Sequence, residues 1–245
     1  MLQNRLSKLR WLVAPAILVL AACGGGSSDP ASTPIPTPDP LAASELIDLA
    51  KVQTTWEIAD FGVGGDADGD AVAAGGAGDG SALKRASVVL IDAAGKVLNG
   101  QTDDNGRYLI KFKLAQIQAP VVLKVVDAGG SVLASTTDQA LAAGKVARIN
   151  INPLTDKIVS DSLNTSVSGT DKSFTGASID LSKLATAKAN LIASIQAALA
   201  TAGITNAATL DPIRSVYAYD GTGVDAVIES ISHSRDPATG ATVLT

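Results

Sequence analysis

Short apolar runs separated by turn residues fill residues 83–151, and this pattern constrains the fold of the chain more than any other feature. Ala86, Val88 and Leu90 alternate with their neighbours along one run, and apolar residues alternate again over residues 107–114. A period of two is typical of half-buried strands. The Asn-Gly step at residues 105–106 favours a tight turn between two of them.

A second hairpin is predicted around residues 127–130, between strands over 120–126 and 131–135. Ala147, Ile149 and Ile151 mark a last strand. About six or seven short strands in one region predict a small antiparallel β-sandwich. A mainly helical segment follows it, so we expect an α+β fold class.

Two motifs in this region resemble the carboxypeptidase regulatory-like domain. They are Ala86–Asp92 with Gly95, and Thr102–Tyr108, which contains the Asp-Asn-Gly-Arg-Tyr turn. The resemblance covers residues 79–152 and implies a transthyretin-like (Ig-like) sandwich. In that family the module is an accessory that carries no catalytic residues, so the resemblance implies none here.

Residues 153–235 are expected to be mainly helical. Asn152–Thr155 closes the sandwich, and Asp180 can cap a helix over 181–202 that ends at Gly203. This helix either packs on its own domain or docks to a partner helix. Its apolar face comprises Leu184, Leu191, Ile192, Ile195, Ala198, Leu199 and Ala202.

The end of the chain predicts a loop and a short helix over 219–229, and then an unpaired strand at 241–245. We interpret residues 236–245 as a truncated strand. The order of sandwich and helices is similar to that of proteobacterial lipoproteins in which a further β region often follows, so a missing domain stays open.

The first 22 residues have the layout of a secretory signal peptide. Arg5, Lys8 and Arg10 precede an apolar core over 11–22. That core is shorter than the roughly 20 residues that a membrane-spanning helix needs.

Cys23, the only cysteine, follows Leu-Ala-Ala, and this arrangement resembles the lipobox of bacterial lipoproteins. The resemblance implies a diacylglyceryl group on the Cys23 thiol, and two or three acyl chains anchor stably. We therefore expect a palmitate-type lipid, cell-envelope localisation and the membrane as a partner. Gly24 stands where Asp favours inner-membrane retention in enteric lipoproteins, which points to the outer membrane.

A tether follows the cysteine. Residues 23–40 are rich in Gly, Ser and Pro, so we expect a disordered spacer that is stiffened by its prolines. Residues 41–78 are expected to hold a short helix, over 41–53, and a Gly/Asp-rich mobile loop, over 60–80.

Composition excludes several functions. Without the three basic residues of the signal, 16 Lys and Arg remain against 24 Asp and Glu, a net charge near −8 that disfavours nucleic acid as a partner. Aromatic residues make up only 3%, which disfavours sugar-stacking platforms.

The residues for common catalytic chemistries are scarce. His233 is the only histidine, and we interpret it as a solvated side chain rather than a catalytic base. No Gly-x-Ser-x-Gly elbow is present. One histidine and one lipidated cysteine do not make a zinc site. We therefore expect no catalytic residues and no enzyme activity.

Asp66, Asp68 and Asp70 form the one candidate metal site. Carboxylates at alternating positions can converge on calcium, but Ala71 and Ala77 stand where an EF-hand-like loop needs Gly and Glu. The alternative is a solvated acidic linker. No other cofactor is expected.

Three functions remain open from the sequence. The first is a non-enzymatic envelope lipoprotein that displays a sandwich as a structural or interaction module for an envelope protein. The second is an envelope lipoprotein that binds a small ligand, a glycan or calcium. The third is an accessory part of an envelope hydrolase.

Overall fold

The computed structural model describes residues 69–126, 130, 132–163, 174–216 and 218–245, which all belong to one compact unit. Cys23, the tether and the helix expected over 41–53 lie outside the described residues. The strands are β1 (Asp70–Gly76), β2 (Ser87–Ile91), β3 (Val97–Gln101), β4 (Arg107–Lys113), β5 (Val122–Val126), β6 (Val132–Thr136), β7 (Val146–Arg148), β8 (His233–Arg235) and β9 (Thr242–Leu244). The helices are α1 (Pro153–Ser162), α2 (Leu181–Ser194), α3 (Gln196–Thr201) and α4 (Gly223–Ser230), with short 3₁₀ turns at Leu114–Gln116, Gly176–Ser178 and Ala207–Thr209.

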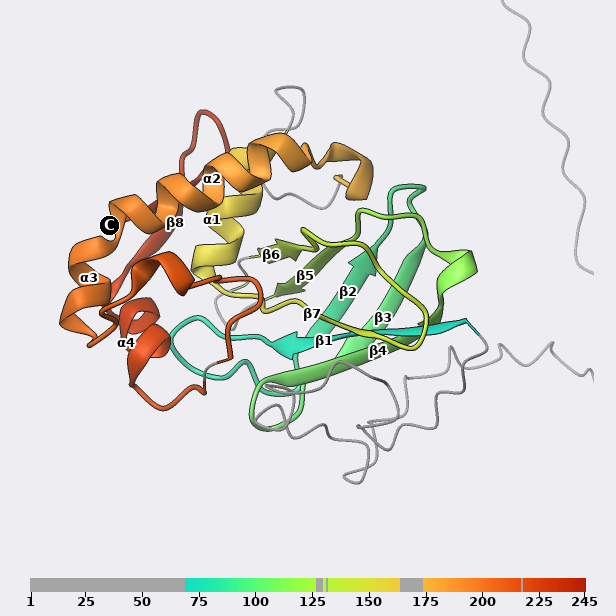
Figure 1. Cartoon of the computed structure of the whole chain (residues 1–245), viewed down its shortest axis with the longest axis horizontal. Coiled ribbons are helices and arrows are strands. Elements are labelled where there is room, and N and C mark those ends of the chain that lie inside the picture. Colours follow the sequence, from blue (N-terminus) through green and yellow to red (C-terminus); the bar gives the residue numbers. More distant parts are fainter. Residues whose placement is uncertain (1–68, 127–129, 131, 164–173, 217) are drawn as a thin grey trace, which may run out of the picture. The chain divides into compact units, whose positions relative to one another are not determined.

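The expected α+β class is confirmed. The first seven strands form two sheets, in the orders β4-β1-β7 and β3-β2-β5-β6. All pairs are antiparallel except β1 with β7, which is parallel. Figure 1 shows the helices gathered at the β6 end of the sheets. No helix in the described part of the chain is long and apolar enough to cross a bilayer.

One apolar core joins the two sheets. It contains inward-facing side chains such as Val88 and Leu90 from one sheet, and Ile110 and Phe112 from the other. The same core continues into the helices through residues such as Leu184. The alternation in the sequence is therefore the pattern of side chains that this core requires.

The hairpin predicted between residues 120–126 and 131–135 is confirmed as a pair of antiparallel strands. β2 pairs with β3 around the Asp92–Gly95 turn, and β5 pairs with β6. In the Asp103–Gly106 turn, Asp103 Oδ1 accepts hydrogen bonds from the backbone N–H groups of Asn105 and Arg107, at 2.8 and 2.7 Å. This side chain closes the turn that leads into β4.

The loop predicted over 60–80 is wrong for residues 70–76. These residues form β1, the central strand of the three-stranded sheet, and all seven are buried. Five of its seven residues are Ala or Gly, and Gly75 has no room for a side chain: a Cβ there would lie 2.2 Å from the carbonyl oxygen of Ile149. A composition that resembles a linker here belongs to a buried strand, and the first sheet begins at residue 70.

Helix α1 covers the outer face of β5 and β6. Asn152 caps it, since its side chain accepts from the N–H of Thr155 and the Thr155 hydroxyl accepts from the N–H of Asn152. Val159 and Phe174 then pack with Val122 in a second, smaller apolar cluster.

The helix predicted over 181–202 begins as expected but is not continuous. Asp180 caps α2 through the N–H groups of Ser182 and Lys183. The helix breaks at Ile195, next to Ser194, whose hydroxyl donates to the Leu191 carbonyl in the kind of local bond that bends helices. The predicted apolar face packs on its own domain: four of its seven residues are buried, and the other three pack against the core as partly buried residues.

The unpaired strand predicted at 241–245 is wrong. Thr242–Leu244 forms β9 and pairs with β8 in an antiparallel hairpin. The strand is also held against α1, because the N–H of Thr242 donates to the hydroxyl of Ser160 at 3.0 Å. The short helix predicted near residue 225 is confirmed as α4.

Asp156 joins this hairpin to the sandwich. The carboxylate is 0% exposed, and it accepts from the N–H of Ala134 on β6 (2.9 Å) and from the hydroxyl of Thr242 (2.6 Å). Arg235 forms an ion pair with it at 2.9 Å and also donates to the carbonyl of Val132. Burial raises the pKa of Asp156, although Arg235 opposes this shift.

We expect Gly75→Ala to destabilise the protein by about 1–3 kcal/mol, because the new Cβ would collide with backbone that cannot move aside easily. The measurement is urea unfolding followed by circular dichroism. Ser87→Ala, at an exposed position of β2, is the control and should change the free energy of unfolding by less than about 0.5 kcal/mol. Equal stability of Gly75→Ala and wild type would contradict the close packing.

We expect Asp156→Ala to destabilise by about 3–5 kcal/mol, because it leaves Arg235 and the N–H of Ala134 without the carboxylate that they bind. Asp161→Ala, in a more exposed ion pair on the same helix, is the matched control, with an expected loss under about 1 kcal/mol. Both are read from urea unfolding at neutral pH. A similar decrease in the free energy of unfolding for the two variants would contradict the central role of Asp156 in joining these elements.

Candidate functional site

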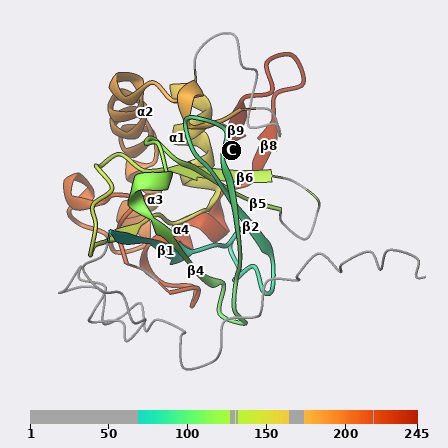
Figure 2. The same ribbon diagram turned by 90° about the vertical axis from the view of Figure 1, so that its right-hand side faces the viewer.

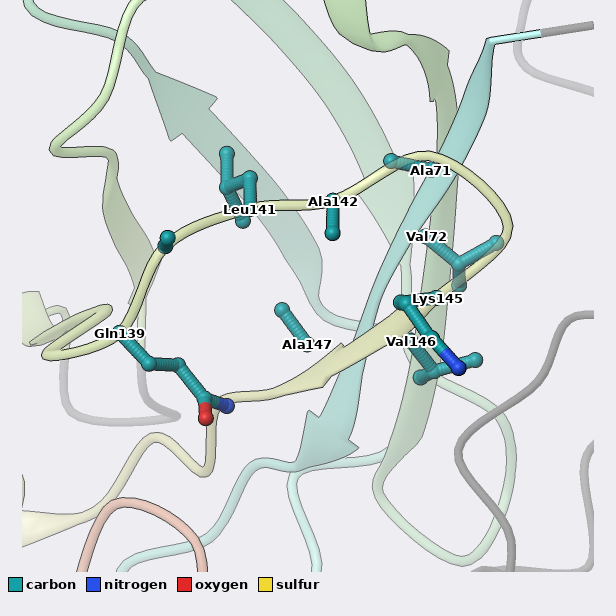
Figure 3. A pocket seen from close by; sticks show the side chains of 9 residues that line it. Ala71, Val72, Gln139, Leu141, Ala142, Lys145, Val146 and Ala147 are labelled. Carbon is teal, nitrogen blue, oxygen red and sulfur yellow. The ribbon is translucent and has the colours of Figure 1, made fainter.

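The described part of the chain has a small pocket beside β1 and β7. The loop between β6 and β7 arches past these strands, and Figure 3 shows alanine side chains around the space that it leaves. The volume is about 220 Å³, below the 300–1,000 Å³ of typical ligand sites. Gln139 and Lys145 are the only polar side chains in its lining, which includes no carboxylate, histidine or hydroxyl. Lys145 is therefore the only ionisable side chain in the lining of this pocket.

A cluster of charges joins α2 to the loops at residues 138 and 211. Lys188 Nζ lies 2.5 Å from Asp138 and 2.8 Å from Asp211, and Arg214 pairs with both carboxylates. Burial would lower the pKa of Lys188, but its hydrogen bonds to Asp138 and Asp211 outweigh burial and raise it. Nearby, burial lowers the pKa of Arg148 to about 10. The acids are all paired with bases, so the cluster fastens elements together rather than presenting a free reactive group.

Asp225, in the first turn of α4, is a buried acid, and none of the groups that shift its pKa is a cation. One oxygen accepts from the N–H of Gly221 at 2.7 Å, and the other has no hydrogen-bond partner. Burial raises the pKa of Asp225, and the charges of Glu229 and Asp220 raise it further. The carboxylate destabilises the folded state when it is ionised.

The residues predicted as sites are not brought together. Asp70 is buried in β1, where Lys113 and Lys111 bind its two oxygens at 2.7 and 3.0 Å. These lysines lower the pKa of Asp70, with Lys113 the larger cause. Asp66, Asp68 and Cys23 lie outside the described residues. No group of three His, Cys, Asp or Glu side chains within the described ranges is arranged to hold a metal ion. His233 is half-buried on β8.

Surface strand edges are the other feature that can carry function, because an open edge offers unpaired backbone N–H and C=O groups to a partner. Two of the four sandwich edges are covered. At β6, side chains from α1 bind both the N–H and the C=O of Ala134. Next to β7, the N–H of Asn150 donates to the carbonyl of Ile213, and the Asn150 amide donates to that of Ser215.

The third edge, β4, is guarded by charge. The hydrogen bonds at Ala77–Gly106 and Gly69–Leu114 flank the β1–β4 ladder. In an antiparallel ladder the residues of a strand direct their backbone groups alternately toward and away from the neighbouring strand. Counting from these two bonds, Lys111 and Lys113 direct their backbone N–H and C=O groups away from β1. Lysine is a common means of preventing edge-to-edge association.

The fourth edge, β3, has no hydrogen-bonded strand on its outward side among the described residues, although β4 approaches it at Gly100, beside Ile110 and the carbonyl of Leu109. In the described part of the chain β3 pairs only with β2, and its sequence Val-Leu-Asn-Gly-Gln has no charge and no proline. The backbone hydrogen bonds between Asp92 and Lys96 and between Ala86 and Thr102 set the pattern of the β2–β3 ladder. In this pattern Val97, Asn99 and Gln101 direct their backbone N–H and C=O groups away from β2. Val97 is 50% exposed. We call the outward backbone groups and side chains of these three residues the β3 edge; Figure 1 shows β3 beside β2, and Figure 2 shows the same ribbon turned by 90°.

The sequence pattern predicts short strands in this region but not which of them forms an edge. The edge position depends on the order of strands from different hairpins, which no local pattern encodes. The absence of Lys, Glu, Asp and Pro from residues 97–101 was a usable signal. The role of Asp156 had a weaker signal, in the Asn-Pro-Leu-Thr capping sequence directly before it.

The described part of the chain is a mixed α+β structure, with three sheets and a helical part. Comparisons of the chain with models of protein families, with curated proteins and with solved structures gave no match.

We expect Asp225→Asn to stabilise the protein at neutral pH, because it removes a buried charge near Asp220 and Glu229 while its size is retained. The pKa of Asp225 is higher in the folded state than in the unfolded state. Wild type therefore has its full stability below the ordinary Asp pKa, and it loses stability as the pH rises through the pKa of folded Asp225. The advantage of the variant should therefore shrink as pH is lowered to about 3. Thermal unfolding across pH 3–8 measures this, and a constant difference would refute it.

Proposed function

We propose that this chain is a non-enzymatic, lipid-anchored protein of the cell envelope that displays its sandwich as an interaction module. Support for the anchor comes from the signal-peptide layout and from Cys23 directly after Leu-Ala-Ala. Support for the module comes from the β3 edge, the single observation that carries the proposal. The tether at 23–40 would hold the module at a distance from the bilayer.

We further propose that the sandwich is a carboxypeptidase regulatory-like, transthyretin-like domain. Its most specific motif, Asp103–Tyr108, has a physical role that supports this proposal. Asp103 organises the turn, Gly106 has the positive φ of 73° that the turn needs, and the Tyr108 hydroxyl donates to the carbonyl of Ile149 across the sheet. The motif thus connects a hairpin to the β7 side of the sandwich.

Strand addition is the mode of binding that fits this surface. A segment that lies along β3 would take the unused backbone groups of the β3 edge, and backbone hydrogen bonds supply affinity in such complexes. The side chain of Val97 would add apolar contact on the outer face of the sheet. The binding needs no cofactor.

The anchor is tested by growing cells with an alkyne analogue of palmitate and measuring the label on the purified chain. We expect label on wild type and none on Cys23→Ser, because the thiol is the site of acylation. Ser27→Ala, in the same Gly/Ser stretch, is the control and should keep the label. Mass spectrometry that finds an unmodified thiol at Cys23 in the envelope protein would contradict the proposal.

The membrane is tested separately by sucrose-gradient fractionation of the envelope. Gly24 leads us to expect the chain in the outer-membrane fraction, and Gly24→Asp in the inner-membrane fraction. Circular dichroism of both proteins controls for folding. Identical distributions would remove the outer-membrane assignment and leave the anchor to be judged by its label.

A further inference from the structure

We propose that the β3 edge pairs with the β3 edge of a second copy of this chain, in an antiparallel register with its two-fold axis at Asn99. This pairing names the partner of the surface described above, and so it rests on the proposed function. It would join two four-stranded sheets into one continuous sheet. A two-fold interface of this kind uses the same patch on both copies.

The backbone of β3 is self-complementary in this register. Val97, Asn99 and Gln101 are evenly spaced about Asn99, so Val97 of one copy faces Gln101 of the other and the two Asn99 residues face each other. These three residues point their backbone groups away from β2. Every outward N–H and C=O of the strand therefore meets an outward group of the second copy, which is the condition for an antiparallel ladder.

Charge also favours a second copy at this edge. β3 carries no ionisable side chain, so two copies meet without like charges in opposition. The charged groups at its ends are already paired: Arg85 binds Asp104 through two hydrogen bonds, and Lys96 binds Gln116. The β4 edge instead carries Lys111 and Lys113, which share one carboxylate, Asp70, and the edges at β6 and β7 are covered.

The outer face of the sheet supplies a continuous surface on both sides of the axis. Val97 and Asn99 are exposed on this face, and Val89 and Ile91 on β2 are only partly buried beside them. Helix α1 packs on β6 at the far side of the same sheet. Within the described part of the chain no strand hydrogen-bonds to β3 on its outward side, and β4 of the other sheet contacts β3 through Ile110 beside Gly100.

The pairing should be weak in dilute solution and stronger on a membrane. A strand of five residues buries much less than the roughly 1,200–2,000 Å² of a stable interface. A lipid anchor confines copies to a surface and raises their effective concentration, which converts a weak contact into a populated one. Dimers should therefore increase with the density of the chain on vesicles.

Cross-linking at the axis tests the register. Asn99→Cys places two thiols opposite each other, within the Cα separation that a disulfide allows. The full-length chain is reconstituted in phosphatidylethanolamine/phosphatidylglycerol vesicles and oxidised with copper phenanthroline. We expect roughly tenfold more covalent dimer than for Ser87→Cys, which is exposed on the same sheet face but lies one strand further in. Equal yields for the two variants would overturn the pairing.

A charge at the axis tests the same contact without cross-linking. Asn99→Lys sets two ammonium groups in opposition, whereas Asn99→Gln keeps the site neutral. Sedimentation of detergent-solubilised full-length protein should show self-association weakened at least about fivefold by Lys and little changed by Gln. Circular dichroism controls for folding. A monomer at every concentration, or equal association of the two variants, would refute the proposal.

The anchor and the pairing can fail separately. Palmitate label with no Asn99→Cys dimer would retain the anchor and reject the second copy as partner. Dimer in detergent with no label would retain the pairing and reject the anchor. Wild type is oxidised in parallel, since a dimer in that sample would reveal a free thiol at Cys23.

Discussion

The fold requires partners for the backbone hydrogen-bonding groups at the edges of its sheets. The buried carboxylate of Asp156 is the most important of these partners. It binds the N–H of Ala134 on β6, the hydroxyl of Thr242 and the guanidinium of Arg235. One side chain thus closes a sheet edge, fixes α1 and holds the terminal hairpin. A buried charge is costly unless all its partners are present, so these elements must be assembled together.

Two sheet edges are covered by other parts of the chain, and this leaves the remaining edges for contact with a partner. The helices occupy the β6 end, and residues 211–215 flank β7. Of the two remaining edges, β4 carries Lys111 and Lys113, whereas the sequence of β3 has none of the usual protections of an edge strand. The proposed function uses this asymmetry: helices stabilise the body, and the opposite strand meets a partner. The pocket and the charge clusters, in contrast, hold groups that are already paired or too confined to act.

The sequence predicted those strands and helices in which one face is apolar and buried and the other is more exposed. The strands around Val88 and Ile110 and the cap at Asp180 have this character. β1 was missed because all of its residues are buried and its neighbours leave no room for larger side chains, so its composition resembles a linker. The β8–β9 pairing and the Asp156–Arg235 contact were missed because they join distant segments that have no local periodicity.

The position of β1 also determines how the body would respond to mechanical load. Chain leading from the N-terminus enters the described structure at Gly69, directly before a strand that lies between β4 and β7. A pull directed along β1 would shear both of its ladders at once, rather than unzip one pair after another. The strand built of the smallest side chains is thus the one that would resist tension.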